Sequence, residues 1–153
     1  MIEHHRLGME RIGGRAKSTA EFAALRCALA PRGMCRLHVA RHKGAFAGAL
    51  LNLYYRDWVE YFTPVAVDEY RAEQVMSALI ATAMQDACLS GARIWNWGGT
   101  WPTQAGVYHF KKGWGAIDHP YVYYGAVLDE RLAAASADSL REQFPFFYSR
   151  PFA

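Results

Sequence analysis

The sequence predicts an α+β (α/β) fold in which a mixed, mostly antiparallel central sheet is flanked by helices. Three observations lead to this prediction: three successive β-rich runs, a long amphipathic helix after them, and a short strand that ends in paired glycines. The chain has 153 residues, which is the length of one ordinary domain. We therefore expect a single domain over residues 1–153.

The N-terminal part begins without a clear pattern. Residues 1–17 show no sustained hydrophobic period, so we expect a loose N-terminal segment or a short strand there. Ser18 and Glu21 have the spacing of a capping box, in which each side chain accepts a hydrogen bond from a backbone N–H near the helix start. The spacing predicts a helix from this box to about Ala30, ended by Pro31.

Three strands should follow in series. Residues 34–42 alternate between apolar and polar side chains, and residues 45–55 continue after a short turn, which together predict a hairpin. A third strand is expected over residues 58–63. Pro64 should end it, because proline cannot donate a hydrogen bond to a sheet.

The second half should alternate helices with short strands. Residues 72–90 carry an apolar stripe at three-to-four spacing, and Gly91 is suited to terminate that helix. We expect the remaining elements over residues 93–97 (strand), 103–111 (helix with Pro102 near its start), 114–117 and 121–127 (strands) and 129–143 (helix), followed by an apolar tail over residues 144–153.

Composition excludes several classes of protein. Hydrophobic residues make up 52% and charged residues 20%, and the net charge of +3 includes no long run of one sign, so we expect no DNA-binding arm. Cys27, Cys35 and Cys88 show no paired spacing, which is typical of a cytoplasmic protein without disulfides. No run resembles a signal peptide or a transmembrane segment.

The segment from Asn96 to Gly115 carries a specific resemblance. It contains Asn96, Gly98 and Gly99 after a strand, then Gly106-x-Tyr108-x-Phe110-Lys111, the turn Gly113-Trp114-Gly115 and an aromatic run from Tyr121 to Tyr124. With the order of elements over residues 34–127, these residues resemble the FemAB-type branch of the GNAT acyltransferases, which includes enzymes that build peptidoglycan bridges.

The resemblance implies where an acyl donor would bind. In GNAT enzymes the strands corresponding to residues 58–63 and 93–97 splay apart, and an acyl thioester lies between them. We therefore expect acetyl-CoA or another acyl-CoA as co-substrate. Residues 65–74 lack the glycine-containing phosphate loop that the family usually has. The candidate donor-binding residues are Asn96, Gly98, Gly99, Phe110 and Arg71.

Three residues are candidates for acyl-transfer chemistry. Glu60 lies where the family often has a general base, although an exposed carboxylate on the sheet is an equally good interpretation. Tyr108 lies near the tyrosine that protonates the leaving thiolate in many GNAT enzymes, and packing is its alternative role. Lys111 matches the lysine of the family's Phe-Lys motif, but a lysine at a helix C-terminus also interacts favourably with the helix dipole.

Histidines are weaker candidates. His109 and His119 are alternative bases among six histidines. His38 and His42 would lie roughly 13 Å apart along one strand, too far to share a metal ion, so we expect no metal site.

The sequence thus favours an N-acyltransferase that acts on the amine of a small amino-sugar or amino-acid-like acceptor. One alternative is an aminoacyl-tRNA-dependent transferase acting on a cell-wall or envelope precursor, and tRNA is a partner only under that hypothesis. Another is a non-catalytic, truncated GNAT module. The short N-terminal part leaves open a homodimer that completes the acceptor side.

Overall fold

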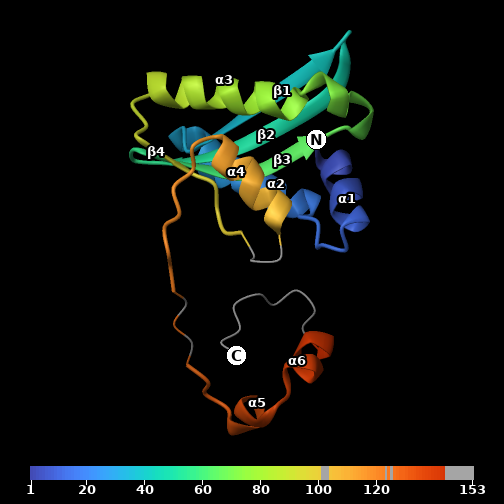
Figure 1. Cartoon of the computed structure of the whole chain (residues 1–153), viewed down its shortest axis with the longest axis vertical. Helices are drawn as coiled ribbons and strands as arrows, with labels where there is room; N and C mark the ends of the chain where they lie inside the picture. Colours follow the sequence, from blue (N-terminus) through green and yellow to red (C-terminus); the bar gives the residue numbers. More distant parts are fainter. Residues whose placement is uncertain (101–103, 123, 125, 144–153) are drawn as a thin grey trace. The chain divides into compact units, whose positions relative to one another are not determined.

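The computed structural model describes residues 1–100, 104–122, 124 and 126–143, which form two compact units, Met1–Ala116 and Ile117–Ala153. The first unit contains a four-stranded sheet and its helices (Figure 1). Its elements are α1 (Ile2–Arg11), α2 (Thr19–Leu29), η1 (Ala30–Arg32), β1 (Cys35–His42), β2 (Ala45–Tyr55), β3 (Trp58–Ala66), η2 (Asp68–Glu73), α3 (Val75–Leu89), β4 (Ile94–Asn96) and α4 (Ala105–Gly113). The second contains α5 (Glu130–Ala134) and α6 (Ala137–Gln143).

The sheet has the order β1-β2-β3-β4. The first three strands pair antiparallel, and β4 pairs parallel with β3, so the predicted mixed, mostly antiparallel sheet is confirmed. Lys43 and Gly44 in the β1–β2 turn both have positive φ, as a tight hairpin with the native twist requires. Helix α3 runs along one face of the sheet, and α1 and α2 lie on the other side (Figure 1).

Strands β3 and β4 pair over only three residue pairs, and the last of these is Glu60 with Asn96. Beyond that pair, residues 61–66 of β3 keep β2 on one side, while no described strand pairs with their other edge. The β2–β3 register shifts so that Leu51 faces Thr63 and Asn52 faces Tyr61, which leaves Phe62 as the extra residue of a β-bulge. The strands therefore diverge next to a bulge.

The core lies between α3 and the sheet. Leu50, Leu79, Ile80 and Ala83 form its buried cluster, and the partly buried Trp95, Trp97 and Trp114 pack against it. Ile80 and Ala83 belong to the predicted apolar stripe of the long helix, and Gly91 has the positive φ expected of its terminator. The three-to-four spacing of apolar residues thus correctly predicted which side of this helix is buried.

The first helix corrects the prediction for residues 1–17. Instead of a loose segment or a strand, residues 2–11 form α1, which Arg6 stabilises through ion pairs with Glu3 and Glu10 one turn away on either side. The helix also packs against β3, a tertiary contact that hydrophobic periodicity along the chain does not reveal. The capping box of Ser18 and Glu21 is confirmed at the start of α2.

Two strand predictions are also corrected. Strand β3 continues through Pro64 to Ala66, because the free edge beyond Glu60 is a place where a missing N–H is tolerated. The structure contains no strand within the described part of residues 114–117 and 121–127. Tyr121, Val122 and Tyr124 are largely exposed there, since no neighbouring strand gives them a surface to pack on.

The remaining differences concern the C-terminal half. The helix predicted over residues 129–143 is divided into α5 and α6, and Asp129 caps the first of them by accepting a hydrogen bond from the Arg131 N–H. Pro102, Trp101, Tyr123 and the tail over residues 144–153 lie outside the described residues.

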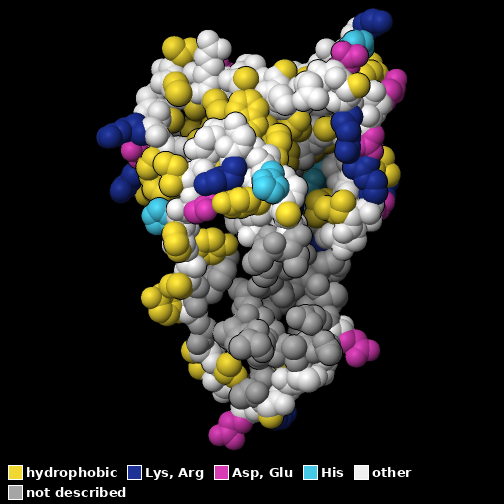
Figure 2. All heavy atoms as spheres, in the orientation of Figure 1, with side chains coloured by type: hydrophobic (Ala, Val, Ile, Leu, Met, Phe, Trp, Pro, Cys, Tyr) yellow, Lys and Arg dark blue, Asp and Glu magenta, His cyan; other side chains and the backbone are white. Residues whose placement is uncertain are grey.

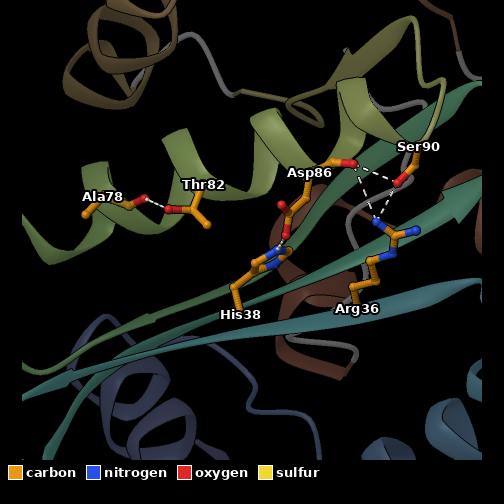
Figure 3. A network of polar contacts seen from close by, with 6 residues as sticks. All are labelled: Arg36, His38, Ala78, Thr82, Asp86 and Ser90. Carbon is orange, nitrogen blue, oxygen red and sulfur yellow. Dashed lines mark hydrogen bonds and ion pairs between the residues drawn. The ribbon is translucent and has the colours of Figure 1, made fainter.

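Helix α3 is tied to the edge strand β1 by a polar network (Figure 3). The His38 Nε2 lies 2.9 Å from the Asp86 Oδ2, and the Arg36 Nη1 donates to the Ser90 Oγ at 2.6 Å. The Arg36 guanidinium also lies over the ring of Tyr54, 4.7 Å from its centroid. These contacts attach the last turns of α3 to the outermost strand.

The surface of the described residues carries hydrophobic, basic and acidic side chains side by side (Figure 2). Lysine and arginine side chains lie in several separate groups on the face that Figure 2 shows. No helix in the described ranges has the length and apolar character needed to cross a membrane.

Candidate functional site

The most distinctive polar contact joins the two strands at the point where they diverge. The Asn96 Nδ2 donates to the Glu60 Oε2 at 2.6 Å, and the Asn96 Oδ1 accepts from the Gly98 N–H at 3.0 Å. Gly98 has a positive φ of 68°, and a Cβ there would lie 3.4 Å from the Glu60 Oε1. Asn96 therefore holds both the carboxylate and the loop after β4.

Lys111 on α4 fixes the same loop from the other side. Its Nζ donates to the Gly98 carbonyl at 3.2 Å, the Gly99 carbonyl at 2.9 Å and the Thr100 Oγ1 at 2.8 Å. An ammonium group has three hydrogens, so these contacts use all of its donors. In this structure Lys111 holds the loop against α4, and its charge reaches Glu60 only through space.

The environment shifts both ionisable groups towards their neutral forms. Partial burial raises the pKa of Glu60, and this effect outweighs the hydrogen bond from Asn96 and the charge of Lys111, which both lower it. Partial burial likewise lowers the pKa of Lys111, against the opposing charge of Glu60. A carboxylate with a raised pKa at a strand divergence is well suited to accept a proton near neutral pH.

Aromatic side chains surround the divergence on the α3 side. The Trp97 ring centroid lies 5.1 Å from that of Tyr61 and 6.1 Å from those of Phe110 and Trp114. Burial raises the pKa of Tyr61 to about 12, so its phenol stays protonated. Phe110 thus packs α4 against Trp97, the residue that follows β4.

Tyr108 lies on α4 and is partly exposed. Its ring is 38% exposed, makes an edge contact with His109 and lies below the Lys112 ammonium. His109 and His119 are exposed as well.

A small cavity of about 230 Å³ opens beside Glu60. Its other lining residues are Leu53, Tyr55, Trp58 and Val59, and the Tyr55 and Trp58 side chains are about half exposed. The Glu60 carboxylate therefore lies next to exposed aromatic surface.

A larger cavity of about 410 Å³ lies along the free edge of β3. Residues 62–66, α1 and η2 contribute to its lining, and so do the cations of Arg11, Lys17 and Arg71. Asp68 forms ion pairs with both Arg11 and Arg71. The Thr63 Oγ1 is buried and has no hydrogen-bond partner within the described chain.

The N-terminal side of this cavity is also ordered by polar contacts. His5 is 6% exposed, and its Nε2 accepts a hydrogen bond from the Lys17 backbone N–H at 3.1 Å. Burial lowers the pKa of His5, so its ring is neutral and carries its proton on Nδ1.

The structure thus brings together Glu60, Asn96, Gly98, Gly99 and Lys111, all of which were candidates from the sequence. Arg71 lines a different cavity from Glu60, and Tyr108 makes its described ring contacts with its own helix. Sequence reasoning missed His5, Lys17 and Thr63. His5 belongs to a helix that the pattern did not predict, and Lys17 and Thr63 belong to no motif, so only the cavity that they line singles them out.

The fold matches solved structures over most of its length. The aminoglycoside acetyltransferase AAC(6')-Iy in complex with a CoA bisubstrate analogue is 15% identical, with a TM-score of 0.62 over 82% of this chain and 91% of that one. A transcriptional regulator from Bacillus halodurans is 16% identical, with a TM-score of 0.59 over 82% and 91%. An aminoglycoside acetyltransferase from an uncultured soil sample, in complex with trehalose, is 11% identical, with a TM-score of 0.59 over 84% and 86%.

At these identities the structural matches establish the fold alone. No curated protein matches the sequence significantly. The sequence model of the acetyltransferase (GNAT) domain matches residues 2–112, which is most of the chain and includes every residue of the Glu60 cluster. The chain therefore belongs to the GNAT acetyltransferase domain family.

Proposed function

We propose that this protein is an N-acyltransferase that transfers an acyl group, in the simplest case acetyl, from acyl-CoA to the amine of a small acceptor. The observation that carries the proposal is the Glu60 carboxylate, held by Asn96 at the last paired position of two diverging strands. A base at that position can remove a proton from an amine that attacks a thioester lying between the strands.

The larger cavity is the proposed donor site. It follows the free edge of β3, whose backbone groups can pair with the amides of a pantetheine arm in the way that another strand would. Arg71 and Arg11 lie at the η2 side, where they can bind the phosphates of CoA. The structural relative with a bound CoA analogue supports this choice of donor.

The chemistry can be assigned to residues of this chain. Glu60 accepts the proton of the acceptor amine. Because its pKa is raised, it is a stronger base than an ordinary carboxylate. Asn96 orients the carboxylate, and Lys111 positions the loop that carries Gly98 and Gly99. Tyr108 is proposed to protonate the leaving thiolate.

The acceptor is proposed to be an amino sugar or an amino-acid-like amine. Exposed aromatic surface beside Glu60, formed by Tyr55 and Trp58, suits stacking against a sugar ring. Two structural relatives are aminoglycoside acetyltransferases, which supports the same class. We further assign the chain to the FemAB-type branch of the family on the motif around Asn96, Tyr108 and Lys111.

The test combines donor binding with turnover. CoA should raise the melting temperature, and acetyl-CoA should release free thiol when a panel of amino sugars and amino acids is supplied. Saturating ligand at 100 times its Kd would stabilise the fold by about 2.7 kcal/mol. No shift at millimolar CoA, together with no thiol release from any amine, would refute the proposal.

A further inference from the structure

The larger cavity contains a lysine whose position is well defined. The Lys17 ammonium lies over the ring of Phe62, 4.6 Å from its centroid. Its backbone N–H donates to the buried His5, and the next residue, Ser18, starts the capping box of α2. Both sides of Lys17 are therefore anchored to helices, and its side chain extends from a fixed backbone into the cavity.

The charge environment of this lysine is unusual. In residues 1–100 and the other described ranges, no carboxylate forms an ion pair or hydrogen bond with its Nζ, although Glu21 acts on it through space. Partial burial lowers its pKa more than that charge raises it. At a given pH, Lys17 is therefore in the neutral amine form more often than an exposed lysine is. The neutral amine is the nucleophilic form.

The ring below Lys17 marks the position of the proposed donor. Phe62 is the bulged residue of β3, two positions after Glu60, the last residue that pairs with β4. The proposed acyl-pantetheine arm follows residues 62–66 in the same cavity. The Lys17 amine and the thioester carbonyl would thus share one confined space, which strongly favours reaction between them.

We propose that Lys17 is a site of self-acylation, at which the protein transfers the acyl group of its own bound donor to the Lys17 Nζ. The inference rests on the proposed acyl-CoA site. The neutral Lys17 nitrogen attacks the thioester carbonyl carbon, a C–N bond forms and the C–S bond breaks. The nitrogen loses one proton and the departing thiolate takes up one, so the products are an N-acyl-lysine and free CoA thiol.

The chain suits a direct test, because it contains only four lysines, Lys17, Lys43, Lys111 and Lys112. The folded full-length protein is incubated with acetyl-CoA, and acetylation of each lysine is followed by peptide mass spectrometry. Lys17 should react at least about 100-fold faster than the exposed Lys43 in the hairpin turn, since only Lys17 is held beside the donor. At saturating acetyl-CoA the rate constant should not depend on protein concentration, because the bound donor and the amine are held in the same complex.

Matched controls separate this reaction from chemical acetylation. Lys17→Arg should abolish the fast acetylation, whereas Lys43→Arg should leave it unchanged. In protein unfolded with urea, Lys17 and Lys43 should react at similar rates. Excess CoA without an acyl group should slow the acetylation of Lys17 by competing for the site.

The outcomes distinguish the two proposals. If CoA raises the melting temperature and amines are acetylated, but Lys17 reacts no faster than Lys43, self-acylation is wrong and the proposed function stands. If CoA causes no shift, no amine is acetylated and Lys17 stays unmodified, both are wrong. Acetylation of Lys17 that is equally fast in the unfolded protein would also overturn the self-acylation site.

Discussion

Replacing Glu60 with glutamine tests the proposed base most directly. The side chain keeps its size, its amide oxygen can still accept the hydrogen bond from Asn96, and the contacts of Lys111 with the loop are untouched. The substitution thus removes the negative charge of the side chain and its capacity to take up a proton, while its shape is kept. General-base catalysis contributes about 10²- to 10⁴-fold to a rate, so kcat should fall by that factor, equivalent to about 2.7–5.4 kcal/mol of transition-state stabilisation.

Glu60→Gln should lower kcat without lowering the stability of the fold. Because burial raises the pKa of Glu60 in the folded protein, the ionised form is held less well there than in the unfolded chain. The carboxylate therefore costs stability above the unfolded pKa, and Glu60→Gln should keep or raise the melting temperature at pH 7.

The assay is thiol release from acetyl-CoA with a fixed amine acceptor, measured across pH for wild type and variant. In the wild type kcat/KM should rise with pH as Glu60 ionises, and this rise should be absent in Glu60→Gln. A variant with wild-type kcat and an unchanged pH profile would show that Glu60 is not the base. A loss of activity accompanied by a large fall in melting temperature would contradict the stability reasoning.

Three further predictions concern the site, the core and a helix start. Asn96→Ala removes a hydrogen bond that lowers the pKa of Glu60, so the acid limb of the kcat/KM profile should move to higher pH. Ile80→Ala should lower the free energy of unfolding in urea by about 2–5 kcal/mol, because the side chain is fully buried, whereas Leu89→Ala on the exposed side of the same helix should change it by less than about 0.5 kcal/mol. Ser18→Ala should cost about 1 kcal/mol in the same measurement, since it removes the cap of α2.

Much of the fold could be predicted from the sequence because its strongest signals are local. The hairpin turn, the capping box at Ser18 and the apolar stripe of α3 each depend on residues within a few positions of one another. Helix α1 was missed although the ion pairs of Arg6 are local, because residues 1–17 show no sustained apolar period and the packing of α1 against β3 is a long-range contact. The prediction of strands over residues 114–117 and 121–127 was wrong for a related reason. A strand needs a neighbouring strand to pair with, and the local pattern does not show whether one is present.

The residues of the candidate site could likewise be predicted only in part. Glu60, Asn96 and Lys111 could be chosen from the strand order and from a resemblance in the segment after β4, and in the structure they lie close to one another. Sequence spacing could not show that the Lys111 ammonium donates all three of its hydrogen bonds to the loop after β4. Lys17 and His5 are far from the motif in sequence, and only the tertiary packing of α1 brings them to the edge of β3.

The position of β1 at the edge of the sheet has a consequence for behaviour at high concentration. An outermost strand presents unpaired backbone groups on which another copy could grow by strand addition. This strand and its turn carry Arg36, Arg41 and Lys43. Two such edges approaching each other would bring like charges together. We therefore expect the charges of β1 to disfavour edge-to-edge association, and Arg36, which ties the strand to α3, is one of them.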